Sequence, residues 1–425
     1  MKHRIKAIFA AVIFAAALLL PSCKSGSGVT LSLLGKKSDL EKSYMKSVIS
    51  QYEEKTGNKI KVIAIKDADF ETYAAEQFES GNAPDIFMHF NNADLNRFDV
   101  TNVFYYLNDQ SWVNDLTDSA KAYCVDENGN LLGLPFWESS VSGCYYNKTL
   151  LDSLGLNPAS TQAEFDMLCE AIAEAGYTPI CWPADGCSWM VQFGLDPIFA
   201  DNPENLDKIN SGEASYADFP EIKNMVSWLY NAAQKGWFGS DYLDCGWDDI
   251  SKKMGSGYAA MTFIWDTWFY TDFKDGQKYS IDDFALMPVF LNTVDGGTYE
   301  GGNLNMMMVN KNGDKLNEAL EFLEFCATPS NYNAAFDGIS TVNSFKGQNT
   351  NIQSKMVSDA KDSIKEKERV STASSRIIGY SGDDMVLALN DMFRGKCDID
   401  GCIKMMDDYR LAEISSDYGS TILTS

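Results

Sequence analysis

Short apolar runs alternate with amphipathic segments along the first ninety residues. The runs at 29–34, 60–65 and 85–90 are short and bounded by glycine, proline or polar residues, which predicts buried strands. Between them, apolar residues recur at four-residue spacing from Leu40 to a glycine at 57, and a second helical segment covers 69–80. Strand, helix, strand, helix, strand predicts parallel βαβ units with right-handed crossovers.

Polar residues mark where several helices begin and end. Ser38 with Glu41, and Thr161 with Glu164, have the spacing of capping boxes. The second pair precedes a helix with apolar residues at 165, 168 and 172. A further helix with an apolar face at 222–233 is expected to stop at a glycine, residue 236.

The later chain adds strands and then helices. Strand-like runs occur at 258–264, 284–290 and 304–309, followed by a helix over 314–326 that is broken before Pro329. The last 70 residues are expected to be helical. Their expected core positions are Ile364, Val386, Leu389, Phe393, Ile403 and Leu411.

The N-terminus has the pattern of an export signal. Basic residues at 2, 4 and 6 precede the apolar run Ala7–Leu20. As a helix this run would rise about 21 Å, less than a membrane core of about 30 Å, so a secretory signal is favoured over a membrane span. The sequence Leu20-Pro-Ser-Cys23 resembles a bacterial lipobox, and we expect Cys23 to be lipidated. Ordinary cleavage near Ser22 is the alternative, and Lys24–Gly28 is typical of a flexible tether.

Composition excludes several classes of protein. The 425 residues favour two domains, and a formal charge of −25 argues against nucleic-acid binding. Only two histidines occur, and His3 belongs to the signal. His89 alternates within a predicted strand, so we expect a packed core histidine. A histidine-based catalytic triad and a His-rich metal site are therefore not expected.

Nine cysteines follow Cys23, without any CxxC spacing, so neither a zinc ribbon nor a clean disulfide framework is indicated. Cys181 with Cys187, and Cys397 with Cys402, could pair locally. Buried reduced thiols are the alternative, and the one we favour.

Eight of the nine tryptophans lie between Trp137 and Trp268. Trp228 and Trp237 lie on or beside a periodic helix and are expected to fill the core. Others lie near Gly, Pro, Asp or Ser at strand ends, where open α/β sheets bind ligands. Aromatic faces beside carboxylates and amides suit sugars, because a pyranose offers an apolar C–H face and a rim of hydroxyls. These other tryptophans are Trp137, Trp182, Trp189, Trp265 and Trp268.

Six segments, in order, resemble the family 1 extracellular solute-binding proteins, the receptors of sugar-importing ABC transporters. In the helix start at Thr161, Gln162 replaces the tryptophan that is usual in the family. The segments are Ser80–Ile86 (SGNAPDI), Leu134–Leu156 with its Leu-Pro-Phe and Tyr-Asn-Lys, Thr161–Phe165, Gly255–Thr262 (GSGYAAMT), Gly301–Asn303, and Ala319–Phe325.

The resemblance implies an α/β, two-lobed, periplasmic-binding-protein-like (type II) fold with a ligand cleft between the lobes. Three hinge crossings are expected near 138–141, 301–303 and 339–344. The expected divisions are a signal peptide over 1–22, the lipidated cysteine and tether over 23–28, a first lobe of 29–138 plus 302–342, and a second lobe of 139–301 plus 343–425.

The resemblance also places ligand contacts in the loops after the strands of both lobes. Asp67, Asn91 and Asn92 directly follow apolar runs, so their side chains would emerge at strand ends. The full expected set is Lys37, Asp67, Asn91, Asn92, Trp137, Glu138, Trp182, Trp189, Trp265, Asp266, Trp268 and Asn303.

These features favour a monomeric receptor, lipid-anchored outside the cytoplasm, that binds a carbohydrate and delivers it to ABC permease subunits. It would be no enzyme and would need no cofactor or metal. Two alternatives remain. An exported glycoside hydrolase would use carboxylate pairs such as Asp67/Asp69 or Asp248/Asp249, and an acidic aromatic cleft would also suit a polyamine or peptide.

Overall fold

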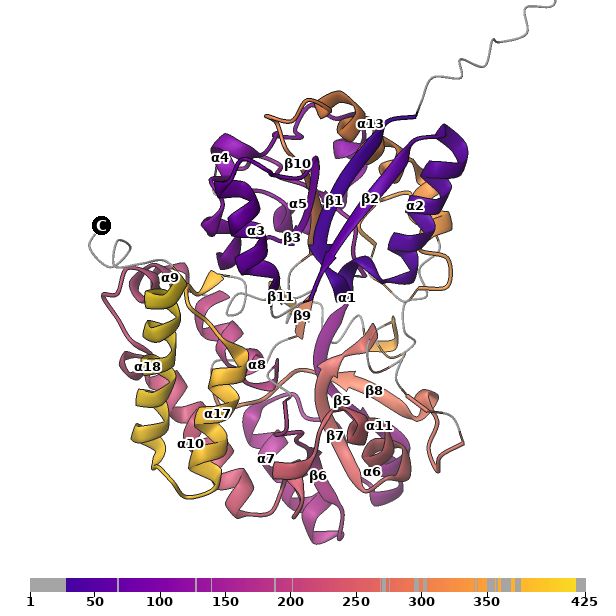
Figure 1. Cartoon of the computed structure of the whole chain (residues 1–425). Coiled ribbons are helices and arrows are strands. Elements are labelled where there is room, and N and C mark those ends of the chain that lie inside the picture. Colours follow the sequence, from indigo (N-terminus) through magenta and orange to yellow (C-terminus); the bar gives the residue numbers. More distant parts are fainter. Residues whose placement is uncertain are drawn as a thin grey trace, which may run out of the picture.

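The computed structural model shows two lobes, each built on its own β-sheet (Figure 1). Each sheet lies in a separate cluster of buried apolar side chains, so the chain has two cores. None of the helices in the described part of the chain is long and apolar enough to cross a membrane. The structure describes residues 28–66, 69–126, 128–138, 140–186, 189–200, 202–267, 269, 273–274, 276–293, 298–300, 304–339, 341, 343–349, 356, 358–360, 368–370 and 376–417.

The first sheet has the strand order β2-β1-β3-β10-β4. Strand β1 pairs in parallel with β2 and β3, which confirms the predicted parallel βαβ units. Strand β10 is antiparallel to both β3 and β4, because it enters this lobe from the other one. The bounds are β1 (Thr30–Lys36), β2 (Lys59–Ile65), β3 (Ile86–Phe90), β4 (Leu134–Pro135) and β10 (Asn305–Val309).

The first long helix forms where the four-residue spacing predicted it. Helix α2 (Ser43–Thr56) buries Tyr44, Val48 and Tyr52 and ends at Gly57, whose φ of 76° is left-handed. The capping box predicted from Ser38 and Glu41 is wrong. A separate short helix, α1 (Lys37–Leu40), contains Ser38 and has no side-chain cap, and the chain turns at residues 41–42 before α2 begins.

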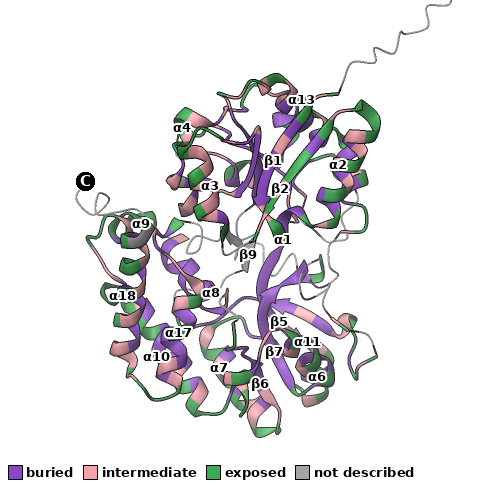
Figure 2. Cartoon of the chain, in the orientation of Figure 1, coloured by how far each residue is buried: buried purple, intermediate pink, exposed green. Residues whose placement is uncertain are grey.

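The second sheet has the strand order β11-β9-β5-β7-β6, and β8 also pairs with β5. Strand β5 is antiparallel to β7, β8 and β9, whereas β6 and β7 are parallel. In Figure 2 the strands β5 and β7 are purple, whereas the edge strand β2 of the first sheet carries exposed and half-buried residues. The bounds are β5 (Val141–Asn147), β6 (Thr178–Cys181), β7 (Ala259–Trp265), β8 (Phe284–Met287), β9 (Thr298–Glu300) and β11 (Glu368–Val370).

Two predicted helices of the second lobe are confirmed. Helix α7 (Gln162–Glu174) starts at Thr161, whose hydroxyl accepts the Glu164 N–H. The Glu164 carboxylate accepts the N–H of Ser160 and not that of Thr161, so the cap is confirmed but the reciprocal bond of a capping box is displaced by one residue. Helix α10 (Pro220–Gln234) ends just before Gly236. Further helices are α3 (Phe70–Glu79), α4 (Val100–Val103), α5 (Asp118–Tyr123), α6 (Lys148–Leu154), α8 (Trp189–Ala200), α9 (Pro203–Asn210), α11 (Trp247–Ser256), α13 (Leu316–Ala327), α14 (Pro329–Ala335), α17 (Gly382–Phe393) and α18 (Ile399–Asp417).

The C-terminal helices α17 and α18 pack against the second core. Val386, Leu389 and Ile403 are buried and Phe393 is partly buried there, as predicted. Leu411 as a core position is wrong, because its side chain is 41% exposed, whereas the neighbouring Arg410 faces inward. Ile364 lies outside the described residues.

The stretch 343–349 packs with the first lobe. Phe345 belongs to the first core, the Thr117 N–H donates to Ser344 O at 3.0 Å, and the Lys346 N–H donates to Asp115 O at 2.8 Å. The sequence assigned residues from 343 onward to the second lobe. The apolar side chain of Phe345 instead keeps this stretch against α5 and the 3₁₀ turn Ser111–Asp115.

Candidate functional site

Polar and aromatic side chains gather at one edge of the first sheet. The parallel strands β1 and β3 end there at Lys36 and Phe90, and the antiparallel β10 begins there at Asn305. In Figure 1 this edge faces the second sheet. In open α/β sheets the carboxyl ends of strands are where ligands bind.

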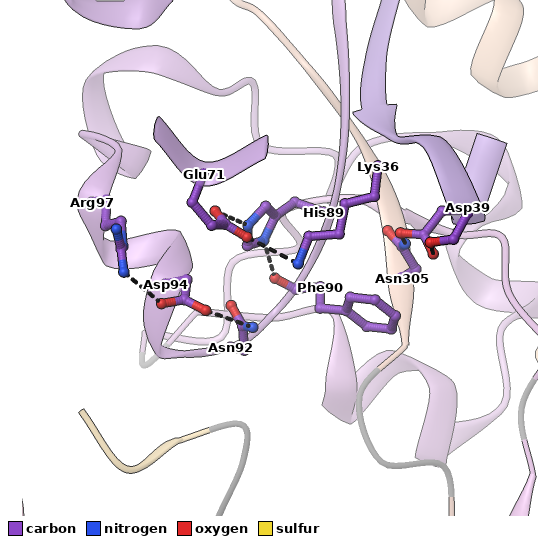
Figure 3. A network of polar contacts seen from close by, with 10 residues as sticks. Lys36, Asp39, Glu71, His89, Phe90, Asn92, Asp94, Arg97 and Asn305 are labelled. Carbon is purple, nitrogen blue, oxygen red and sulfur yellow. Dashed lines mark hydrogen bonds and ion pairs between the residues drawn. The ribbon is translucent and has the colours of Figure 1, made fainter. Parts of the chain in front are cut away.

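A charged network occupies part of this edge (Figure 3). The Glu71 carboxylate at the start of α3 lies 3.1 Å from Lys36 Nζ and 3.0 Å from His89 Nε2. His89 Nδ1 lies 2.6 Å from Phe90 O, which can only accept, so Nδ1 is the donor.

The environment of Glu71 favours its ionised form. Burial of the carboxylate raises its pKa, but the hydrogen bond and charge of His89, together with Lys36, outweigh burial and hold the pKa at about 2. His89 is 2% exposed and stacks on Phe70 and Phe87, which confirms the predicted core histidine.

Three amides line the same edge. Asn305 Nδ2 donates to Asp39 Oδ2 at 2.8 Å, and both residues are buried. Asn91 Nδ2 donates to the carbonyl oxygens of Tyr123 and Val125, so this amide holds a neighbouring loop. Asn92 Nδ2 is 3.4 Å from Asp94 Oδ2. The buried Oδ1 atoms of Asn92 and Asn305 have no hydrogen-bond donor among the described residues.

The first crossing between the lobes is fixed by contacts of Trp137 and Glu138. The Glu138 carboxylate forms an ion pair with Lys42, whose Nζ lies 5.3 Å from the centre of the Trp137 ring. That ring packs edge-on against Phe90, at 5.2 Å between centroids, and against Tyr44 at 6.2 Å. Trp137 therefore stays half-buried at the edge of the first lobe.

The second lobe presents a cluster of three tryptophans, which we call the tryptophan cluster: Trp189, Trp247 and Trp265. Trp189 lies 5.0 Å from Trp247 and 6.1 Å from Trp265, and its Nε1 donates to Phe263 O at 2.9 Å. Trp189 and Trp247 are half-buried, and Trp265 is 8% exposed. The cluster brings the first residues of α8 and α11 against the last residue of β7.

Asp266 follows Trp265 directly and is 2% exposed. Its Oδ1 accepts the Val141 N–H at 2.8 Å, so the carboxylate ties the end of β7 to the start of β5. Val141 lies at the end of the first crossing, three residues after Glu138, which forms the ion pair with Lys42.

The structure brings some predicted site residues together and separates others. Trp265, Asp266 and Trp189 lie together in the second lobe, and Trp137 and Glu138 on the first crossing. Trp182 is 4% exposed and stacks on Phe238 at 5.0 Å, inside the second core. Lys37 is exposed and lies 3.8 Å from Glu41. Four residues lie outside the described ones: Cys23, Asp67, Trp268 and Asn303.

Sequence reasoning did not select Trp247, Phe90, Lys36 or Glu71. Trp247 has the signal used for the other tryptophans, because a glycine precedes it and an aspartate follows it. Glu71 gives no such signal, because its contacts with Lys36 and His89 arise only where α3, β1 and β3 meet. Within the described residues, no group of three or more His, Cys, Asp or Glu side chains could hold a metal ion.

Comparison with known families and proteins gives a consistent result. The profile of the family described as "Bacterial extracellular solute-binding protein" matches residues 47–362. A multiple sugar-binding protein of Streptococcus mutans is 29% identical over 154 residues, which span 36% of this chain and 35% of that protein. The aligned segment is therefore about a third of the relative.

Solved structures share the fold at low sequence identity. RafE of Streptococcus pneumoniae, solved with raffinose, has a TM-score of 0.70 at 16% identity, covering 91% of this chain and 99% of that one. A putative binding protein of Bacillus subtilis in an open conformation has a TM-score of 0.77 at 16% identity, covering 92% and 99%. A sugar transporter protein of Bacillus licheniformis with stachyose has 0.67 at 18%, covering 89% and 98%. The predicted two-lobed fold is confirmed.

The Glu71 network generates a prediction about stability. In the folded protein the pKa of the Glu71 carboxyl group is about 2, below its ordinary value of 4.5. The ionised carboxylate therefore stabilises the fold fully above pH 4.5, and this contribution is lost as the pH falls toward 2. Glu71→Gln should lower the free energy of unfolding at pH 7 by about 3 kcal/mol. Urea denaturation between pH 7 and pH 3 measures this.

The matched control is Glu54→Gln on α2, where an exposed carboxylate accepts a hydrogen bond from the Ser50 hydroxyl. Its effect should stay within about 0.5 kcal/mol. Equal stability of Glu71→Gln and the unchanged protein at pH 7 would contradict the assigned role of the network.

Proposed function

Because the chain belongs to the family of bacterial extracellular solute-binding proteins, we propose that it captures a sugar or oligosaccharide between its lobes for an ABC importer. The tryptophan cluster supports this proposal most directly. It places two half-buried indole rings and one nearly buried ring at the end of a strand of the second lobe. The names of the relatives, which include a multiple sugar-binding protein and a raffinose complex, agree with a sugar ligand.

The lobes of this proposal are 28–138 with 304–349, and 140–300 with 356–417. The second boundary is moved beyond 349 because Phe345 belongs to the first core. Each lobe has its own apolar core, so rotation of the lobes about the crossings would break few apolar contacts. A ligand that touches both lobes then shifts the population toward a closed form.

Aromatic rings would recognise the apolar faces of the sugar, and amide groups would form hydrogen bonds with its hydroxyls. The rings of Trp137 and the tryptophan cluster would stack on the apolar faces of sugar rings. The Asn92 carbonyl oxygen lacks a donor among the described residues, and a ligand hydroxyl would supply one. An unpaired buried acceptor costs about 1–3 kcal/mol, so this need favours hydroxyl-rich ligands. Asp67, Trp268 and Asn303 stay in the proposed contact set.

We assign a different role to Glu138 and Asp266. The Glu138 carboxylate is paired with Lys42, and Asp266 Oδ1 accepts the Val141 N–H. Both groups would therefore fix the geometry of the first crossing, and the ligand would lie against Trp137. The same pairing argues against their use as a glycosidase acid and nucleophile, and we propose that the protein catalyses no reaction.

Ligand identity is tested by tryptophan fluorescence titration with raffinose, stachyose, chito-oligosaccharides and xylo-oligosaccharides. Trp189→Ala should weaken binding of the active sugar at least tenfold, about 1.4 kcal/mol, because it removes the central ring of the tryptophan cluster. Trp228→Phe is the matched control, because Trp228 is 7% exposed in the core beside α7, away from the cluster, and its variant should bind normally.

Other outcomes of this titration select the alternatives. Binding of spermidine, with no response to any glycan, would favour a polyamine receptor. Release of reducing sugar from a bound glycan would make the protein a glycoside hydrolase.

Delivery to a permease would require the protein to stay at the membrane, and we propose a lipid on Cys23 as its anchor. Cys23→Ala should move the protein from the membrane fraction to the soluble fraction, because the variant lacks the sulfur that would carry the lipid. Fractionation followed by immunoblotting measures this, with Cys397→Ala as the control. Retention of the Cys23 variant in the membrane fraction would refute lipid anchoring.

A further inference from the structure

Charge is divided unevenly between the segment that follows Cys23 and the rest of the chain. Residues 24–66, which include β1, α2 and β2, contain nine lysines and four carboxylates, a net charge of +5. Residues 67–425 contain 23 basic and 56 acidic residues, a net charge of −33. The segment next to the proposed anchor therefore has the opposite sign to everything after it.

Four of these lysines mark the side of the first lobe along β2, which we call the basic edge: Lys46, Lys59, Lys61 and Lys66. Strand β2 is the outermost strand of the first sheet. Lys59 and Lys61 are two positions apart and so point to the same face of the strand, and Lys66 directly follows its end. All four lysines are exposed, and Figure 2 shows exposed residues along β2.

Helix α2 adds Lys46 to this edge. Lys46 precedes Glu53 by seven residues, so the two side chains lie on the same stripe of the helix. The Glu53 carboxylate accepts the Ile60 N–H at 2.9 Å and lies 2.8 Å from Lys59 Nζ, so this stripe faces β2. Figure 1 shows α2 beside β2.

Three charges of the basic edge are available to an external anion. Lys59 is paired with Glu53. Within the part of the chain that the structure describes, no carboxylate forms an ion pair with Lys46, Lys61 or Lys66. The edge therefore keeps a positive charge although the protein as a whole is acidic.

The tether joins the first lobe beside the basic edge. The Val29 N–H donates to Asn58 Oδ1 at 3.0 Å, and the Lys59 N–H donates to Val29 O at 2.8 Å. The stretch from Cys23 to Val29 can span at most about 20 Å when fully extended. A lipid on Cys23 would therefore hold the start of β2 close to the membrane surface.

Salt screening decides between the local positive charge and the net negative charge of the whole protein. The Debye length is about 8 Å at physiological ionic strength, so exposed charges act on a surface mainly within that distance. The second lobe lies at the other end of the molecule from the start of β1, as Figure 1 shows. Lysines near a bilayer attract anionic lipid headgroups.

We propose that the basic edge is an interaction surface for anionic lipid headgroups, which orients the first lobe on the membrane. The orientation rests on the proposed Cys23 anchor. The affinity for anionic headgroups is a property of the folded lobe and does not require the anchor or a bound sugar.

Vesicle sedimentation tests this surface with the chain from residue 24 onward, which keeps all the described residues and carries no lipid. At about 0.1 M salt, the protein should bind vesicles with about 30% phosphatidylglycerol about threefold more than pure phosphatidylcholine vesicles. The difference should vanish at about 1 M salt, where the Debye length is about 3 Å. Because Cys23 is absent, the result does not depend on lipid anchoring.

Charge reversal locates the surface. Lys46→Glu combined with Lys61→Glu should abolish the preference for anionic vesicles, because it reverses the charge at two exposed, unpaired positions of the basic edge. The matched control combines Lys208→Glu on α9 with Lys252→Glu on α11. These two lysines are exposed in the second lobe, and the change in net charge is the same. The control should bind as the unchanged protein does.

Two further measurements on these variants separate the outcomes. Both double variants should keep the melting temperature and the tryptophan fluorescence response to sugar, which reports on the proposed function independently. Equal loss of vesicle binding in both double variants, retained binding when the basic edge is reversed, or equal binding to neutral and anionic vesicles would overturn the proposal.

Discussion

Burial of apolar surface in two separate clusters is the constraint on which the rest of the structure depends. Leu33 of β1 and Phe345 belong to the first cluster, whereas Tyr145 of β5 and Leu389 of α17 belong to the second. Each sheet lies in its own cluster of buried apolar side chains, so each lobe has a core of its own. The lobes can then move relative to each other while both cores stay intact, which is the physical requirement for closing on a ligand.

Charged side chains set the geometry where the chain passes between the cores. Lys42, just before α2, pairs with Glu138, and Asp266, just after β7, accepts the backbone N–H of Val141. These contacts lie on either side of the first crossing and orient the strands that enter it. Trp137 directly precedes Glu138 and packs edge-on against Phe90, so an aromatic ring lies at the start of the crossing.

Local patterns in the sequence are sufficient for most of the elements but not for the site. The strands at 30–36, 59–65 and 86–90 and the cap at Thr161 follow from residue spacing that needs no tertiary information. Glu71 acquires its role only because α3, β1 and β3 meet, and Trp182 enters the core because Phe238 stacks on it. The carboxylate of Glu138 shows the same limit, since Lys42 lies 96 positions away along the chain.

Small-angle X-ray scattering with and without the sugar found by titration shows whether the two lobes rotate toward each other on binding. The radius of gyration should fall when the ligand binds, because the lobes rotate toward each other about the crossings while each keeps its own core. Saturating ligand with an unchanged scattering curve, in a protein whose tryptophan fluorescence reports full binding, would contradict it. The lobes would then be a single rigid body.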